Sequence, residues 1–215
     1  VHPDDEHAQK IGYKRGKNEA WFFIESDPGA SIVYGQKTKN KEELQEMINQ
    51  DKWDDIYKKY PVADGNFVYL PAGCLHAMGK GNVVYEIQQS TDVTYRFYDY
   101  HRKDKDGNER ELHLKQAIDC LSFDKDIDKN DVHPVVKVHE NVKETIFISN
   151  DSFTVSQLLV IGKCQYKCDN YQLATVVKGS GKVDEYDVKV GDNFLIPTNT
   201  SIELDGQMMI MMTTK

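Results

Sequence analysis

The chain has 215 residues, of which 39% are hydrophobic and 29% charged, values that are ordinary for a soluble globular protein. Its net charge of -8 argues against a nucleic-acid partner, because such a partner requires a basic surface that displaces phosphate counterions. No apolar run approaches the roughly 20 residues that span a bilayer, so we predict no membrane segment. An acidic ligand would therefore need a local basic pocket.

The N-terminal residues and the cysteines both indicate a cytoplasmic protein. The opening Val1-His2-Pro3-Asp4 has neither the basic start nor the apolar stretch of a signal peptide. It also lacks an initiator methionine, which indicates processing, truncation or a missing N-terminal region. The four cysteines form no C-x-x-C pair and fit a reducing compartment. Cys164 and Cys168 would share one face of a strand, and we interpret them as buried structural thiols rather than metal ligands.

The first half of the chain predicts strands mixed with short helices. Apolar runs at 19–24 and 31–34 flank Asp27-Pro28-Gly29, a turn signal, and we predict a hairpin. Asn40 followed by Glu43 forms a capping box, which predicts a helix over 41–50. The remaining expected elements are a helical turn at 53–57, strands at 67–70, 83–87 and 93–100, and an amphipathic helix at 112–121. The charged run 102–110 is typical of a solvated loop.

The second half predicts an all-β domain. Residues 124–131 are almost entirely Asp, Lys and Asn, and we place the domain boundary there. After this run, short strands are expected at 145–149, 153–161, 172–177, 192–196 and 208–212. Their regular spacing is typical of a sandwich or barrel.

An internal echo links the two halves. The segment from Gly65 to Pro71 and the segment from Gly191 to Pro197 both contain a turn glycine, a strand and a proline at the same spacing. The first copy continues to His76, whereas the second copy has no histidine. Only the first half therefore carries a candidate metal-binding histidine at this motif.

Four short segments carry a family resemblance. The spacing G-x5-P-x-G-x2-H, ending at His76, resembles the second motif of the cupin superfamily. The opening six residues resemble the Gln-x-His-Pro-Asp segment of type I mannose-6-phosphate isomerases, and residues 16–21 resemble the Lys-x-Glu strand of that family. Residues 85–86 and 90–96 resemble the segment that carries the family's catalytic arginine. The segments follow the family's order and are most similar to its short bacterial form.

This resemblance implies an all-β fold of two cupin (jelly-roll) barrels with a short helical insertion and a helical connection. The first domain would be residues 1–124, with the insertion at about 41–58 and a helix at about 112–121, and the second would be residues 125–215, without metal ligands. His2, Glu19 and His76 would bind zinc as a catalytic site. The family's fourth ligand, a glutamine two positions before His2, has no counterpart here. We therefore expect the first domain to be N-terminally incomplete and the chain alone to bind zinc weakly.

The resemblance also implies residue roles around the metal. Lys17 shares a strand face with Glu19 and resembles the family's active-site lysine. Arg96 resembles the arginine beside the sugar, and Glu86 matches an active-site glutamate, although a structural carboxylate paired with Arg96 is an alternative. For the substrate phosphate we select Arg102 and Lys80. Lys80 lies in a Gly-Lys-Gly turn, where a solvated side chain is an equal alternative.

The implied activity is a zinc-dependent interconversion of mannose 6-phosphate and fructose 6-phosphate. The sequence leaves open whether Glu86, Lys17 or a zinc-bound water moves the proton, and it leaves the oligomeric state open. The main alternative is a non-catalytic cupin that binds a metal or a sugar, and a metal-dependent dioxygenase is a more distant one. Lys17 and Arg96 favour the isomerase, because a simple metal sensor has no use for two cations at its site.

Overall fold

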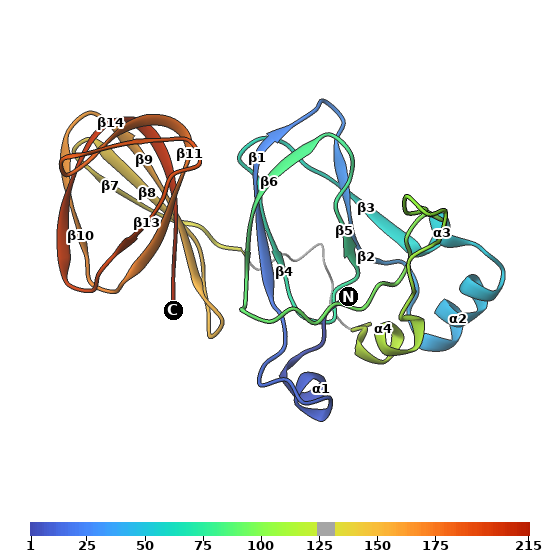
Figure 1. Cartoon of the computed structure of the whole chain (residues 1–215). Coiled ribbons are helices and arrows are strands. Elements are labelled where there is room, and N and C mark those ends of the chain that lie inside the picture. The colour runs from blue at the N-terminus through green and yellow to red at the C-terminus, as the bar shows by residue number, and fades with distance from the viewer. Residues whose placement is uncertain (124–131) are drawn as a thin grey trace. The chain divides into compact units, whose positions relative to one another are not determined.

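The computed structural model describes residues 1–123 and 132–215. The chain divides into two compact units, Val1–Asn130 and Asp131–Lys215, and strands dominate both (Figure 1). The predicted domain boundary after residue 124 falls outside the described residues. Among the helices that the structure describes, none is long and apolar enough to cross a membrane.

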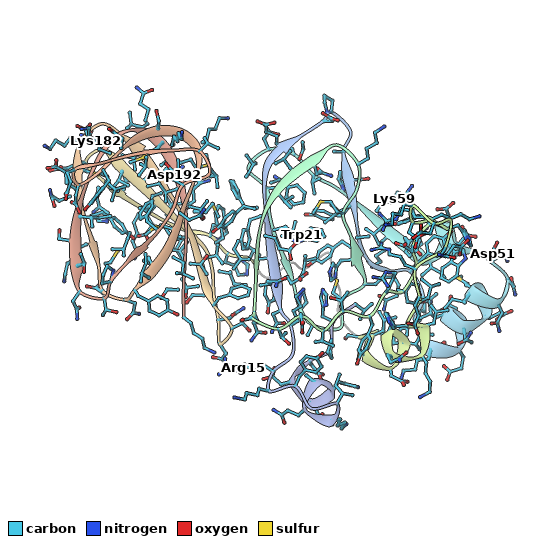
Figure 2. The ribbon with its side chains drawn as sticks, in the orientation of Figure 1. Arg15, Trp21, Asp51, Lys59, Lys182 and Asp192 are labelled. Carbon is cyan, nitrogen blue, oxygen red and sulfur yellow. The ribbon has the colours of Figure 1, made fainter. Side chains whose placement is uncertain are left out.

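The first unit is a sandwich of two three-stranded sheets. One sheet has the order β4-β1-β6 and the other the order β3-β2-β5. Inward-facing apolar residues of both sheets, among them Trp21 of β1, Tyr34 of β2 and Leu70 of β4, form one core cluster, and Figure 2 shows Trp21 pointing between the sheets. The strands are β1 (Glu19–Ser26), β2 (Ser31–Gln36), β3 (Tyr57–Pro61), β4 (Phe67–Leu70), β5 (His76–Ala77) and β6 (Asn82–Gln88).

The predicted hairpin at 19–34 is wrong. The turn itself is present, with the Ala30 N–H donating to the Asp27 carbonyl at 2.9 Å and with Gly29 at a φ of 81°. However, β1 pairs with β4 and β6, whereas β2 pairs with β3 and β5. The turn carries the chain from one sheet to the other because both strands have longer-range partners that bury their inner faces.

Helices cover one end of the first unit. Helix α2 (Lys41–Asn49) begins where predicted, because Asn40 Oδ1 accepts the Glu43 N–H at 2.8 Å. The short α3 (Trp53–Ile56) follows, but the helical region ends there, since residues 57–61 form β3. Helix α4 (Leu114–Cys120) lies within the predicted 112–121. Leu44, Ile56 and Ala117 from these three helices are fully buried in a second core cluster.

Helix α1 (Asp5–Lys10) was not predicted from the sequence. Asp4 caps it, since its side chain accepts the His7 N–H at 2.9 Å. The residues that form its cap and first turn were interpreted only as part of a metal motif, which hid the local capping signal.

The predicted strand over 93–100 is also wrong. The segment forms no strand, and within it Tyr95 exchanges two backbone hydrogen bonds with Val1, at 2.9 and 3.1 Å. Among the described residues it belongs to neither sheet of the first unit. Its apolar alternation arises because Val93 and Phe97 are buried, not because the segment forms a ladder.

The second unit is a barrel-like sheet with the order β12-β11-β14-β9-β8-β7 (Figure 1). Strand β10 pairs with β14, and β13 pairs with β11. The five predicted strands are present, and β7 and β12 were missed. Cys164 and Cys168 lie on β10 and are buried free thiols, as predicted. The strands are β7 (Val135–His139), β8 (Val142–Ser149), β9 (Thr154–Ile161), β10 (Cys164–Cys168), β11 (Gln172–Val183), β12 (Tyr186–Lys189), β13 (Asn193–Ile196) and β14 (Thr200–Thr214).

The internal echo has the same hydrogen bonds in both units. The Gly65 N–H donates to the Phe23 carbonyl at 2.8 Å, and the Gly191 N–H donates to the Val176 carbonyl at 2.9 Å. Phe23 and Val176 each donate back to the residue after the glycine, at 3.0 Å in both units. The two turns are therefore structurally equivalent, and they set equivalent registers for the strands that follow.

These registers identify equivalent positions in the two units. Glu19 pairs with Leu70 at the start of β1, and Gln172 pairs with Ile196 at the start of β11. Gln172 thus takes the position of Glu19. His76 lies 11 residues after Gly65, and Ile202 lies 11 residues after Gly191, so an isoleucine takes the position of His76 in the repeat. An amide and an alkyl group replace two of the proposed metal ligands in the second unit.

Candidate active site

His2, Glu19 and His76 converge on one point in the first unit. His2 Nε2 lies 3.3 Å from Glu19 Oε1, and His76 Nε2 lies 3.2 Å from Glu19 Oε2. The three side chains are at most 9% exposed. Among the described residues they form the one group of three His, Cys, Asp or Glu side chains with ligand atoms within 4.8 Å of one another.

Both imidazole rings are oriented by backbone carbonyls. His2 Nδ1 lies 2.9 Å from the Val93 oxygen, and His76 Nδ1 lies 3.0 Å from the Cys74 oxygen. A carbonyl can only accept, so each Nδ1 carries a proton, and with a metal ion bound each Nε2 would offer its lone pair to that ion. This second contact on the far nitrogen is the arrangement that fixes metal-binding histidines in proteins.

The sequence holds these side chains in place through the Pro-x-Gly turn. Gly73, at a φ of 79°, donates its N–H to the His2 carbonyl at 2.8 Å. A Cβ on Gly73 would lie 2.9 Å from the Cys120 carbonyl oxygen, so the turn has no room for a larger residue. Lys17 donates its N–H to the Pro3 carbonyl at 3.0 Å, which ties the start of β1 to the N-terminal segment.

The protonation states suit a metal. Burial opposes the ionisation of Glu19, but hydrogen bonds from His2 and His76 outweigh it and hold the pKa of this carboxyl well below its usual range. Burial lowers the pKa of His76, which favours the neutral imidazole that metals bind. Ligands about 2.1 Å from a tetrahedral ion lie roughly 3.4 Å apart, close to the two separations seen here. Two imidazoles and a carboxylate therefore fit zinc.

Lys17 lies two residues before β1, and its side chain reaches the same buried cluster as that of Glu19. Its Nζ lies 2.7 Å from Glu19 Oε1, and its side chain is only 8% exposed. A buried ammonium group beside a metal ligand is costly unless it is paired. The pair places a proton donor directly beside the cluster.

Glu86 lies on β6, opposite Trp21 of β1. Its Oε2 accepts the Trp21 Nε1–H at 3.1 Å, and the Trp21 ring packs edge-on against His76 with centroids 5.5 Å apart. Burial and the charge of Glu19 both raise the pKa of Glu86. Glu86 thus lies beside the cluster, and its pKa is above that of an ordinary carboxyl. The Arg96 side chain, which the sequence offered as a possible partner of Glu86, donates to the Glu111 carbonyl at 2.8 Å.

A pocket of about 380 Å³ opens beside the two histidines. His2, His76 and Arg96 line it together with segment 94–100, which supplies an aromatic wall of tyrosines. Arg102 and Arg110 also line it, and Asp99 is its one acidic lining residue. The pocket is therefore positively charged in a chain whose net charge is -8.

Asp99 joins two of these arginines. Its side chain is 5% exposed, and its carboxylate accepts hydrogen bonds from Arg102 Nε at 3.2 Å and from Arg110 Nε at 2.7 Å, with further contacts from both Nη2 groups. The bonds from Arg110 and Arg102 outweigh desolvation and hold the pKa of Asp99 well below its usual range. Both guanidinium groups remain about half exposed, so they are fixed in place and still accessible.

Sequence reasoning missed Arg110 and Asp99. We interpreted the charged run 102–110 as a solvated loop. The one sequence signal for an anion-binding role in this run was its second arginine, at its end. Lys80, selected from the sequence for phosphate, is exposed in the turn before β6 and is not among the lining residues of the pocket. Lys17 and Glu86 are also absent from that lining.

Three sequence comparisons point to one family. The sequence model described as the mannose-6-phosphate isomerase cupin domain matches residues 143–215. Mannose-6-phosphate isomerase of Streptococcus mutans is 37% identical over 217 residues, which cover 98% of this chain and 68% of the relative. Mannose-6-phosphate isomerase ManA of Bacillus subtilis is 36% identical and is covered to 64%. The chain thus spans about two thirds of the length of these relatives.

Solved structures agree. The crystal structure of the mannose 6-phosphate isomerase from Bacillus subtilis superimposes with a TM-score of 0.94 at 30% identity, covering 100% of this chain and 70% of that one. A putative mannosephosphate isomerase from Archaeoglobus fulgidus shares the fold, with a TM-score of 0.74 at 17% identity over 99% of this chain and 66% of that one.

Proposed function

The chain belongs to the mannose-6-phosphate isomerase family, and from this premise we propose that it interconverts mannose 6-phosphate and fructose 6-phosphate with zinc bound by His2, Glu19 and His76. The observation that carries the proposal is the metal-ligating cluster beside a pocket with three arginines. The cluster can hold a Lewis-acidic metal ion, and the arginines can bind a phosphate ester. The isomerisation of a sugar phosphate needs both.

The reaction moves hydrogen within the sugar and changes no other atom. A base removes the proton from C2 of the aldose, and a proton is delivered to C1, while the O2 proton passes to O1. The intermediate is an enediolate, whose negative oxygen must be stabilised. Zinc would supply Lewis-acid polarisation of the sugar oxygens.

Arg96 supports this chemistry from the pocket wall. It lines the pocket with both histidines, so its guanidinium group can stabilise charge that develops on a sugar oxygen. Its backbone N–H donates to His113 Nδ1 at 3.1 Å, which fixes the position of the residue. Water exclusion by Tyr95 and Phe97, which flank Arg96 and also line the pocket, would strengthen the interaction.

Proton transfer is assigned to Glu86 or Lys17. The pKa of Glu86 is raised by burial and by the charge of Glu19, which favours a carboxyl group that can both remove and return a proton. Lys17 is buried against Glu19 and can donate to an oxygen held at the cluster.

For the phosphate, the geometry favours Arg102 and Arg110. Asp99 holds both in the pocket wall, and guanidinium groups form charge-assisted, often bidentate bonds to phosphate oxygens. Lys80 lies outside the pocket lining, so the proposal places the phosphate at the arginines.

The alternative is a non-catalytic cupin that binds a metal or a sugar. The experiment that separates the two is an assay of fructose 6-phosphate formation from mannose 6-phosphate, with the chain saturated with zinc, then chelated, then resupplied with zinc. We expect turnover that is lost on chelation and restored by zinc. Zinc and substrate binding without turnover would favour the alternative.

We also propose a cytoplasmic location. The four free cysteines fit a reducing compartment, where disulfides do not persist. Labelling of the intact cell's thiols with an impermeant reagent should leave this protein unmodified before lysis and modify it afterwards.

A further inference from the structure

The interior of the second barrel has an apolar end and a polar end. Inward positions at one end are filled by buried aliphatic residues, including Leu158, Val160 and Leu204. Toward the other end the same inward faces turn polar. The strand alternation places these residues inside: Glu144 of β8, Ser156 of β9, Tyr166 of β10, Gln172 of β11 and Thr214 of β14.

These five polar residues line a cavity of about 500 Å³. It lies at the end of the barrel that corresponds to the metal end of the first unit, because Gln172 takes the position of Glu19. Small-molecule sites in barrels lie at such mouths, and their volumes run from about 300 to 1,000 Å³. The position therefore offers a binding site, although its ligand cannot be a metal held as in the first unit.

Glu144 gives the cavity its hydrogen-bonding character. Its side chain is 14% exposed, the Tyr166 hydroxyl donates to its Oε1 at 3.0 Å, and Lys137 Nζ lies 3.8 Å from its Oε2. Burial raises the pKa of Tyr166, which keeps this hydroxyl protonated. A carboxylate turned into a barrel is costly unless its oxygens are hydrogen-bonded, and a ligand hydroxyl at Oε2 would complete the set.

The charges of the lining residues favour a neutral ligand over an anionic one. Lys137 and Lys167 balance Glu144 and Asp169, so the lining has no net charge when its histidine is neutral. The remaining inward groups are an amide and hydroxyls, which both donate and accept hydrogen bonds. Ser156 is 4% exposed, so its hydroxyl lies deep in the wall.

We propose that the second barrel binds a neutral polyhydroxy compound, an unphosphorylated monosaccharide or sugar alcohol, in this cavity. Sugar hydroxyls would donate to Glu144 and exchange hydrogen bonds with Gln172 and Ser156. The site is separate from the isomerase site and does not depend on zinc or on the arginines of the first unit.

The test is calorimetric titration of the full chain, without zinc, with D-mannose, D-glucose and D-mannitol. Binding of at least one in the millimolar range or tighter is expected. Gln172→Leu and, independently, Ser156→Ala should each weaken that binding about tenfold or more, the scale of one lost hydrogen bond in a buried site. Thermal melting of each variant checks that it is folded, and either folded variant suffices for the comparison.

Two controls locate the site. Gln207→Leu makes the same change on an exposed residue of β14 and should leave sugar affinity unchanged. His76→Ala disrupts the proposed metal site of the first unit and should also leave it unchanged, even though isomerisation is lost. Failure of all three compounds to bind, or binding that His76→Ala removes while Gln172→Leu and Ser156→Ala do not, overturns the proposal without bearing on the isomerase.

Discussion

Gly73 donates its backbone N–H to the carbonyl oxygen of His2 at 2.8 Å, although the two residues lie far apart in the sequence. The turn that leads to His76 therefore also holds His2. One backbone contact couples both histidines of the proposed metal site, so the Pro-x-Gly motif does more than bend the chain.

Gly73→Ala should weaken zinc binding as well as stability. Alanine at a φ of 79° is strained, by about 1 kcal/mol or more, and its Cβ would also press on the Cys120 carbonyl. Gly29→Ala is the matched control, because Gly29 has a φ of 81° and nothing within 4 Å of an added Cβ. Zinc titration and thermal melting should show similar backbone strain in both variants but reduced zinc affinity in Gly73→Ala alone. Equal zinc affinity in the two variants would contradict the coupling.

Arg96→Ala should retain zinc and lose turnover. Removing one group that stabilises transition-state charge lowers kcat by about 10²- to 10³-fold. Arg15→Ala is the control for loss of a positive charge, since Arg15 is exposed on the loop between α1 and β1 (Figure 2). Steady-state kinetics at saturating zinc measure the effect, and a KM change with unchanged kcat would instead assign Arg96 to substrate binding.

Arg110→Ala should raise the KM for mannose 6-phosphate by about tenfold or more, because one charge-assisted bond to phosphate is lost. Lys80→Ala tests the residue that the sequence alone suggested, and it should change KM little, since Lys80 does not line the pocket. The same kinetic assay ranks the two variants. A larger effect at Lys80 would move the phosphate site to the turn before β6.

Asp99→Asn should destabilise the protein in a pH-dependent way. The two arginines lower the pKa of Asp99 in the folded state, so its contribution is complete above the unfolded pKa of about 3.9 and is lost as pH falls toward the folded value. Urea unfolding of both proteins should give a constant stability difference at neutral pH that shrinks below about pH 4. A difference that grows on acidification would show that the ion pairs are not the cause.

Local chemistry explains which parts of the fold were predictable. The Asn40 cap, the two turn glycines at 65 and 191 and the inward cysteines of β10 act within a few residues, and the structure confirms them. The hairpin at 19–34 failed because strand partners are set by distant segments. The same holds for 93–100, where the backbone of Tyr95 bonds to Val1 instead of to a strand of either sheet.

The candidate site was also predictable only in part. Motif spacing selected His2, Glu19 and His76, and the structure brings their ligand atoms together. Arg110 was missed because its partner Asp99 lies outside the charged run, and only the folded chain shows that the carboxylate is buried. The local sequence pattern of a charged segment is the same whether the segment forms a solvated loop or lines a pocket.

Zinc titration of the wild-type chain, His76→Ala and Glu86→Ala tests the central claim most directly. Loss of a proposed ligand should weaken zinc affinity by more than about a hundredfold, beyond the effect of removing an outer contact. Loss of Glu86, which touches Trp21 and is not a proposed ligand, should leave affinity within a few fold of the wild type. Equal loss of zinc affinity in both variants would contradict the assignment of the metal to His2, Glu19 and His76.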